Sequence, residues 1–132
     1  MTTALELITG AMKDLGVLER DESPQTQEAT DVLEQLNFMC SAWIHDGLDL
    51  EWVTIDDTAD VVPYPEDQMG AIRYSLAMYI APMFEVQPSP ILVSMARMGK
   101  DRLRREYLDV GFLSIDSALQ GINNPNTFGS IP

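Results

Sequence analysis

The segment from residue 66 to residue 81 most strongly constrains the fold, because apolar side chains occupy almost the whole circumference of the helix it would form. They are Ile72, Leu76, Ala77, Met78 and Ile80, and Met83 and Phe84 follow directly. A helix without a polar face is usually central to its domain. Pro82 cannot continue the helix, so we expect it to end near Ala81 and to be covered by other elements.

Length and composition fit one globular domain. The chain has 132 residues, of which 45% are hydrophobic and 22% charged, and a domain of this size can bury a conventional core. The apolar stretch 74–96 contains Pro82, Pro88 and Pro90, so we expect two buried helices there and no membrane span. The first residues lack a basic segment, so we expect no export signal.

Two helices are predicted before the central one. The first covers about residues 3–15, with Thr3 as its N-cap and Gly16 just beyond its end, where a left-handed conformation costs little. The second covers about residues 26–45 and stops at Asp46-Gly47. Their apolar stripes are Leu5, Ile8, Met12 and Leu15 in the first, and Ala29, Leu33, Leu36, Cys40 and Trp43 in the second.

A fourth helix is predicted after the central one. Ser89 is a good N-cap and Pro90 a good first helical residue, and we expect the helix to end near residues 109–111. Its inner stripe is expected to be Leu92, Met95 or Ala96, Gly99, Leu103 and Tyr107.

Between the second and third helices the period of the pattern changes. Leu50, Trp52 and Thr54 alternate with their neighbours, residues 56–60 resemble a turn, and 61–64 could return as an edge strand. We therefore predict a small β-hairpin over about residues 50–64. The expected fold is mainly α, a four-helix bundle-like domain that carries this hairpin and an extended C-terminal tail.

The C-terminal residues differ in kind from the rest. We expect a helical domain over residues 1–110 and an extended arm over 111–132, in which Ser114 to Leu119 could make a short helix and the end is rich in Asn, Gly and Pro. Such a segment buries too little apolar surface to fold alone, so we expect a partner to order it.

Catalytic and metal-binding patterns are weak. His45 is the only histidine and Cys40 the only cysteine, and their five-residue separation places them on different sides of a helix. Asp56, Asp57 and Asp60 lack the ligand order of a calcium loop. We expect no enzyme activity, no catalytic or metal-binding residues and no cofactor.

Charge is distributed unevenly along the chain. Residues 1–69 hold 16 acids and two bases, whereas 70–132 hold five acids and six bases, which gives −14 and +1 and a total of −13. This acidity argues against free-standing binding to nucleic acid. The basic residues of 97–105 could form a solvated face paired within the helix, for example Lys100 or Arg102 with Glu106, or contact the acidic surface of a neighbouring copy.

The candidate interface residues come from this basic run and from apolar groups in weakly supported segments. Trp52, on a marginal hairpin, fits either the core or an interface, and Phe112 and Phe128 could anchor the arm in partner pockets. The full set is Trp52, Arg97, Lys100, Arg102, Arg104, Arg105, Phe112, Ile122, Phe128 and Ile131.

Four stretches in this order resemble one family. They are 11–17 (Ala-Met-Lys-Asp-Leu-Gly-Val), 33–47 with Leu36-Asn37-Phe38-Met39, 74–82 ending in Ile-Ala-Pro, and 96–100 (Ala-Arg-Met-Gly-Lys). Together they make about residues 3–109 similar to the head-to-tail adaptors of short-tailed bacteriophages, also called head-completion or packaged-DNA stabilisation proteins.

The resemblance implies a structural virion protein, made in the host cytoplasm and located in the neck or tail. Such adaptors are small helical bundles that form a ring, usually of twelve copies, under the portal. The ring extends the DNA channel, helps retain packaged DNA and docks downstream tail or nozzle proteins. The implied partners are therefore further copies, the portal and tail proteins; DNA passes without specific binding, and no membrane is involved. The alternative is a small acidic regulatory protein, for example a DNA mimic.

Overall fold

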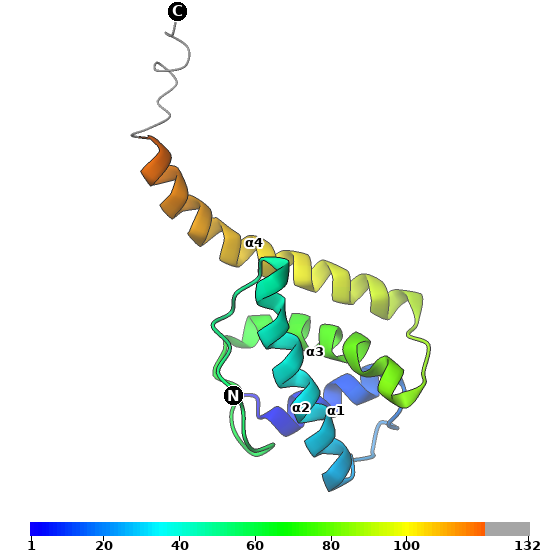
Figure 1. The fold of residues 1–132 in the computed structure, drawn as a ribbon. Helices are drawn as coiled ribbons and strands as arrows, with labels where there is room; N and C mark the ends of the chain where they lie inside the picture. The colour runs from blue at the N-terminus through cyan, green and yellow to red at the C-terminus, as the bar shows by residue number, and fades with distance from the viewer. Residues whose placement is uncertain (121–132) are drawn as a thin grey trace, which may run out of the picture.

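The structure is a computed structural model that describes the backbone of residues 1–120 and the side chains of residues 1–107. Within residues 1–120 the chain forms four α-helices and two short 3₁₀ helices (Figure 1). They are α1 (Ala4–Leu15), α2 (Thr26–Ala42), η1 (Trp43–Asp46), α3 (Glu66–Ile80), η2 (Ala81–Phe84) and α4 (Pro90–Gln120).

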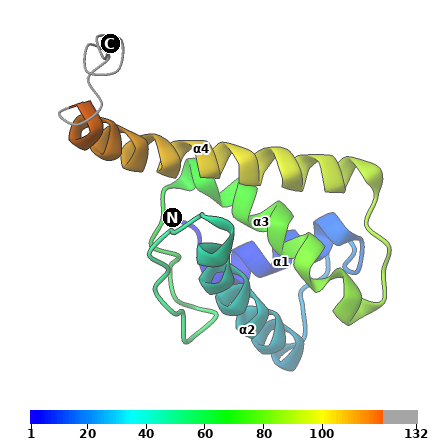
Figure 2. The same ribbon diagram turned by 45° about the horizontal axis from the view of Figure 1, so that its top comes forward.

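Helix α3 is central, as its apolar circumference predicts. It packs against α1, α2 and α4 (Figures 1 and 2), and Ile72, Leu76 and Ile80 are fully buried. Each fully buried side chain of this size contributes roughly 1.5–3 kcal/mol of hydrophobic free energy. The core therefore forms around α3, and the other helices take their positions from it.

The predicted helix ends are confirmed by hydrogen bonds. Thr3 accepts a bond from the backbone N–H of Glu6 at its side-chain oxygen (3.2 Å), and Ser89 does the same for Leu92 (3.1 Å). Gly16 has φ +92° and its N–H bonds to carbonyls in the last turn of α1. Backbone in this region favours glycine, which explains why α1 stops here.

Two inner stripes differ in detail from the prediction. In α1, Ala4 and Leu7 are buried, whereas Leu5 is 41% exposed, because segment 58–62 packs beside the start of α1 through backbone bonds. In α4, Ala96 is buried and Met95 is exposed, which settles the alternative left by the pattern.

The predicted β-hairpin over 50–64 is wrong: in the described part of the chain this region is a loop with one isolated bridge, between Thr3 and Val61. Side chains form hydrogen bonds with the backbone groups that a hairpin would pair. Asn37 of α2 donates to the carbonyl of Ile55 (2.9 Å) and accepts from its N–H (3.0 Å). The return segment pairs with the N-terminal segment instead, since Val62 donates to the carbonyl of Thr2.

The loop 47–65 is also held by two aromatic side chains. The rings of Trp52 and Tyr64 stack with centroids 4.9 Å apart. The Tyr64 hydroxyl donates to the carbonyl of Glu51 and accepts from the N–H of Val53, both at 3.0 Å. These bonds satisfy polar backbone groups that a two-stranded ladder would otherwise have paired, so the loop is ordered without a sheet.

Helix α4 is longer than predicted. It continues to Gln120 instead of ending near residues 109–111, so residues 111–120 are helical and are not an extended arm. Its C-terminal part projects beyond the other helices (Figures 1 and 2). Residues 121–132, where the rest of the predicted arm falls, lie outside the described residues. No helix in the described part of the chain is both long and apolar enough to cross a membrane.

Candidate assembly interface

The crossing of α3 and α4 sets the position of α4 on the domain. A Cβ atom added at Gly99 would lie 2.9 Å from both the Cα and the Cβ of Ala71. The two backbones can approach this closely only because both residues are small. Further along, the Tyr107 hydroxyl donates to the side-chain carbonyl of Gln68 (2.9 Å), which ties α4 to the start of α3.

A groove of about 450 Å³ lies on one side of this crossing. We call it the outer groove. It is lined by Asp67, Gly70, Ala71 and Tyr74 of α3 and by Met95, Met98, Gly99, Asp101, Arg102, Leu103, Arg105 and Glu106 of α4. Small residues form its floor, and flexible methionines form its wall. Methionine side chains adapt readily to a packed partner, so the groove is suited to receive an apolar side chain.

An exposed stripe of α4 borders the outer groove. Ile91 is 76% exposed, Met98 66% and Met95 40%, and Arg102 and Arg105 are also exposed. The positions 91, 95, 98, 102 and 105 share one helical face. We call these five residues the α4 stripe; it is apolar near the start of the helix and basic further along.

A second groove, of about 430 Å³, lies on the other side of α4 and includes Met39 of α2 and Trp43 of η1. Met39, Trp43, Met78 and Tyr79 supply apolar surface, and Arg97 and Lys100 lie at its α4 wall. Ser75 also lines this groove, and its buried hydroxyl has no hydrogen-bond partner among the described residues.

Three of the five predicted basic interface residues form ion pairs within the chain. Lys100 bonds to Asp46 at 2.7 Å and lies over the Trp43 ring, 5.4 Å from its centroid. The hydrogen bond and positive charge of Lys100 hold the pKa of the Asp46 carboxyl below its usual value. This contact fastens the end of η1 to α4.

The other two pairs lie along α4. Arg102 bonds to Glu106 at 3.2 Å, as the solvated-face alternative predicts, and Arg104 bonds to Asp101 at 3.1 Å. Exposed pairs of this kind contribute little to stability, so their side chains can exchange partners at low cost. Arg97 and Arg105 are exposed, and a role for the five basic residues in assembly stays a prediction.

The remaining predicted interface residues divide into two groups. Trp52 is half-buried and packs on the core. Its indole N–H donates to the side-chain oxygen of Asn37 (2.9 Å), so the structure gives it a role within the chain. The backbone of Phe112 belongs to α4, but its side chain lies outside the described set. Ile122, Phe128 and Ile131 lie outside the described residues altogether.

The chemistry-bearing residues are not brought together. Cys40 is buried, and burial raises the pKa of its thiol far above the usual value, whereas His45 is exposed. Asp57 accepts a bond from the N–H of Ala59, and Asp60 one from the N–H of Asp57, so these carboxylates stabilise their own turn. Among the described residues no cluster of three potential metal ligands occurs.

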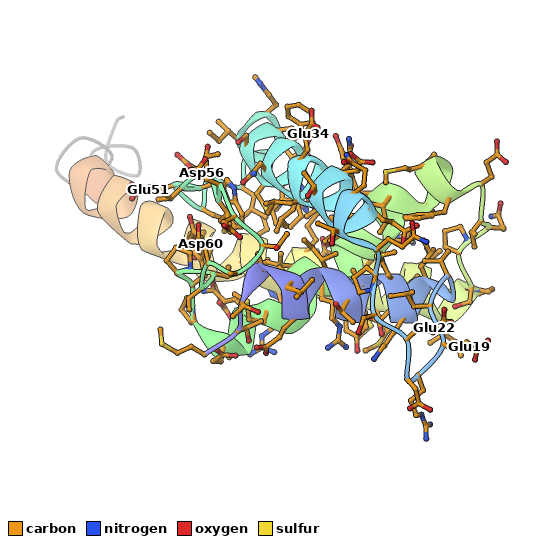
Figure 3. The ribbon with its side chains drawn as sticks, turned by 90° about the horizontal axis from the view of Figure 1, so that it is seen from below. Glu19, Glu22, Glu34, Glu51, Asp56 and Asp60 are labelled. Carbon is orange, nitrogen blue, oxygen red and sulfur yellow. The ribbon has the colours of Figure 1, made fainter. Side chains whose placement is uncertain are left out.

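Acidic side chains extend across the face seen from below (Figure 3). Glu19 and Glu22 come from the connector after α1, Glu34 from α2, and the others from the loop 47–65. The labelled acids in this view are Glu19, Glu22, Glu34, Glu51, Asp56 and Asp60. The basic side chains of 97–105 belong to α4, so the charge asymmetry of the sequence becomes a difference between elements.

Two structural contacts escaped the sequence reasoning. Asn37 fixes the loop through Trp52 and Ile55, and Arg73 of α3 pairs with Asp14 of α1 at 2.7 Å. A polar residue beside the apolar stripe of α2 was the only available signal for Asn37. Nothing local indicates which backbone groups it would meet.

Comparison with known protein families identifies the class. The family model described as P22 tail accessory factor matches residues 1–118. The chain therefore belongs to the P22 tail accessory factor family, which indicates a structural role in a phage tail and a location in the virion. The match spans α1 to α3 and most of α4, including residues 111–118, which the sequence analysis had assigned to an arm. A comparison with curated proteins found no match.

Proposed function

We propose that this chain is a head-to-tail adaptor of a short-tailed phage. In this proposal, copies form a ring between the portal and the downstream tail or nozzle proteins. The ring contains twelve copies if its copy number matches that of the portal. The ring extends the DNA channel and helps to retain packaged DNA. The chain does this as a structural component, without catalysis and without a cofactor.

The observation that carries the proposal is the projection of α4. Tyr107 packs on the core, and the helix continues beyond it for 13 residues, 108–120, a length of about 20 Å, over which its ribbon projects past the other helices (Figures 1 and 2). Most of the stability of a helix in a protein comes from packing of one face, so a projecting segment is stabilised when a partner covers it. A helix that projects from the domain can reach a second ring, as a connector between two rings must.

The charge of the chain supports the proposed passage of DNA. With a formal charge of −13 per copy, a ring around the duplex repels the phosphate backbone instead of neutralising it. DNA can then slide through the channel at ejection without adhering to its wall. Specific DNA binding by the ring is therefore not part of the proposal.

The test is the native mass of the full chain, alone and mixed with the portal ring encoded in the same genome. We expect a complex with about one copy per portal subunit. Deletion of residues 112–132 should leave the helical domain folded by circular dichroism and abolish this complex. A chain that stays a 14.7 kDa monomer and ignores the portal would refute the proposal and favour the acidic regulatory protein, or DNA mimic.

The absence of catalysis has its own test. His45 is the only imidazole in the chain, and acid–base or nucleophilic chemistry at neutral pH commonly uses this group. We expect His45→Ala to assemble on the portal and to support infection as the wild type does. Normal assembly combined with a loss of infectivity would contradict the purely structural role.

A further inference from the structure

The α4 stripe lacks a covering element in the described chain, although its apolar part is large. Ile91 and Met98 are more than half exposed beside a groove floored by small residues. The described part of α4, residues 90–107, carries five bases and two acids, a net charge of +3. A partner that fits this stripe must therefore present an apolar side chain followed by acidic ones.

One helix of the same chain has that pattern. On α2, Phe38 is 53% exposed, Glu34 is exposed, and Asp31 is partly exposed. We call these three residues the α2 stripe. Helix α2 contains three acids and no Lys or Arg, so its charge complements that of α4. Figure 3 shows Glu34 on the outer side of α2, away from the core.

The spacing of the two stripes also matches. Arg102 and Arg105 follow Met98 by four and seven residues, and Glu34 and Asp31 precede Phe38 by four and seven. These separations are about 6 Å and 10 Å along either helix. Antiparallel alignment of the helices therefore places Phe38 at Met98, Glu34 at Arg102 and Asp31 at Arg105. Phe38 then fills the outer groove as a buried aromatic anchor.

The two stripes cannot meet within one molecule. The outer groove is lined by α3 and α4 alone, whereas the groove on the opposite side of α4 includes α2. Helix α2 therefore lies on the side of α4 opposite the outer groove, and Glu34 of its stripe points outward from there (Figure 3). A contact between two different faces is heterologous, so each copy uses both faces, and successive copies form a ring when the rotation between them closes.

We infer that the α4 stripe of one copy binds the α2 stripe of the next copy in antiparallel register, with Phe38 seated in the outer groove. This inference rests on the proposed function, because it identifies the surfaces by which the ring forms. The occupant is a second copy of this chain.

Cross-linking on the assembled complex tests the contact. The complex of full-length chain and portal is first verified by native mass. A chain with Phe38→Cys and Met98→Cys, treated with a short bismaleimide, should give a ladder that extends beyond dimers. The buried Cys40 stays unreactive in the folded chain. Val53 is 61% exposed on the loop 47–65, and the matched pair Val53→Cys with Met98→Cys should give no ladder.

Charge exchange tests the register independently. Arg102→Glu with Arg105→Glu should weaken assembly about tenfold or more at low salt, and adding Asp31→Arg with Glu34→Arg to the same chain should restore it. Arg97→Glu with Arg104→Glu makes the same change in charge on the other face of α4 and should weaken assembly less than the Arg102 and Arg105 pair does.

The outcomes separate the inference from the proposed function. If the wild type does not assemble on the portal, the proposed function fails, and the inference fails with it. If it assembles but the Phe38–Met98 ladder is absent, or charge exchange does not restore assembly, only the inferred contact is overturned. Dimers from Met98→Cys alone would indicate a symmetric α4–α4 contact and would also overturn it.

Discussion

Replacement of Gly99 by alanine tests the close crossing that positions α4. The new Cβ would lie 2.9 Å from the Cα and Cβ of Ala71, whereas carbon atoms pack best at about 3.5–4.0 Å. The helices must therefore separate by roughly 0.6 Å or more. Overpacking of this kind costs about 1–3 kcal/mol, which the better helix propensity of alanine offsets by about 1 kcal/mol. We expect Gly99→Ala to lower the free energy of unfolding by about 1 kcal/mol.

Gly70 supplies the matched control. It lies within α3, and a Cβ added there meets nothing within 4 Å. Gly70→Ala should therefore gain the propensity term alone and raise the free energy of unfolding by about 1 kcal/mol. The two variants change the same atoms on facing helices, so the difference between them isolates the contact at Ala71.

Urea unfolding followed by circular dichroism measures both effects. The midpoints should move in opposite directions while the m-values stay constant. A gain in stability at Gly99→Ala equal to that at Gly70→Ala would show that α3 and α4 do not approach as described. The outer groove would then have a different shape, and the seat inferred for Phe38 would lose its basis.

Three further measurements test the loop, the η1–α4 contact and the core. Asn37→Ala should lower the free energy of unfolding by about 2–3 kcal/mol in urea titrations, because buried backbone groups and Trp52 lose their partner; Asn37→Asp, which keeps the acceptor oxygens, should lose less. The pKa of Asp46 lies below its ordinary value of 3.8 because of Lys100, so its contribution is present above that value and is lost as pH falls through the lowered pKa. Acid titration should therefore destabilise the wild type more steeply than Asp46→Asn below about pH 4. Cys40 should react with a maleimide only after unfolding, and equal labelling rates in buffer and in urea would contradict its burial.

The sequence by itself determined the helices and most of their ends. Thr3, Gly16 and Ser89 act on backbone groups within three or four residues, so their effects can be read from the local pattern. The apolar circumference of 66–81 likewise predicted the central place of α3. Two ends differ: the predicted helix over 26–45 changes from α to 3₁₀ after Ala42, and α4 continues to Gln120 although Gly111 resembles a stop.

The candidate interface was predicted less completely. The basic run on α4 was visible in the sequence, but its pairing with Asp46 and Asp101 was visible only in the structure. The α4 stripe combines Ile91 and Met98 with arginines, and exposure of the apolar pair could not be inferred before the buried face of the helix was known. A periodic pattern identifies faces of a helix, but the packing decides which face is covered.

Tertiary structure alone decided the path of residues 47–65. Alternation predicted two strands, since that pattern suits a pleated surface with one buried face. A strand also requires a partner for its backbone. Here the side chain of Asn37, 18 residues before Ile55, forms hydrogen bonds with the backbone of Ile55 instead. The close approach of Gly99 to Ala71 is of the same kind. Local patterns fix what a segment can form, whereas contacts between residues distant in sequence depend on the packed core that brings them together.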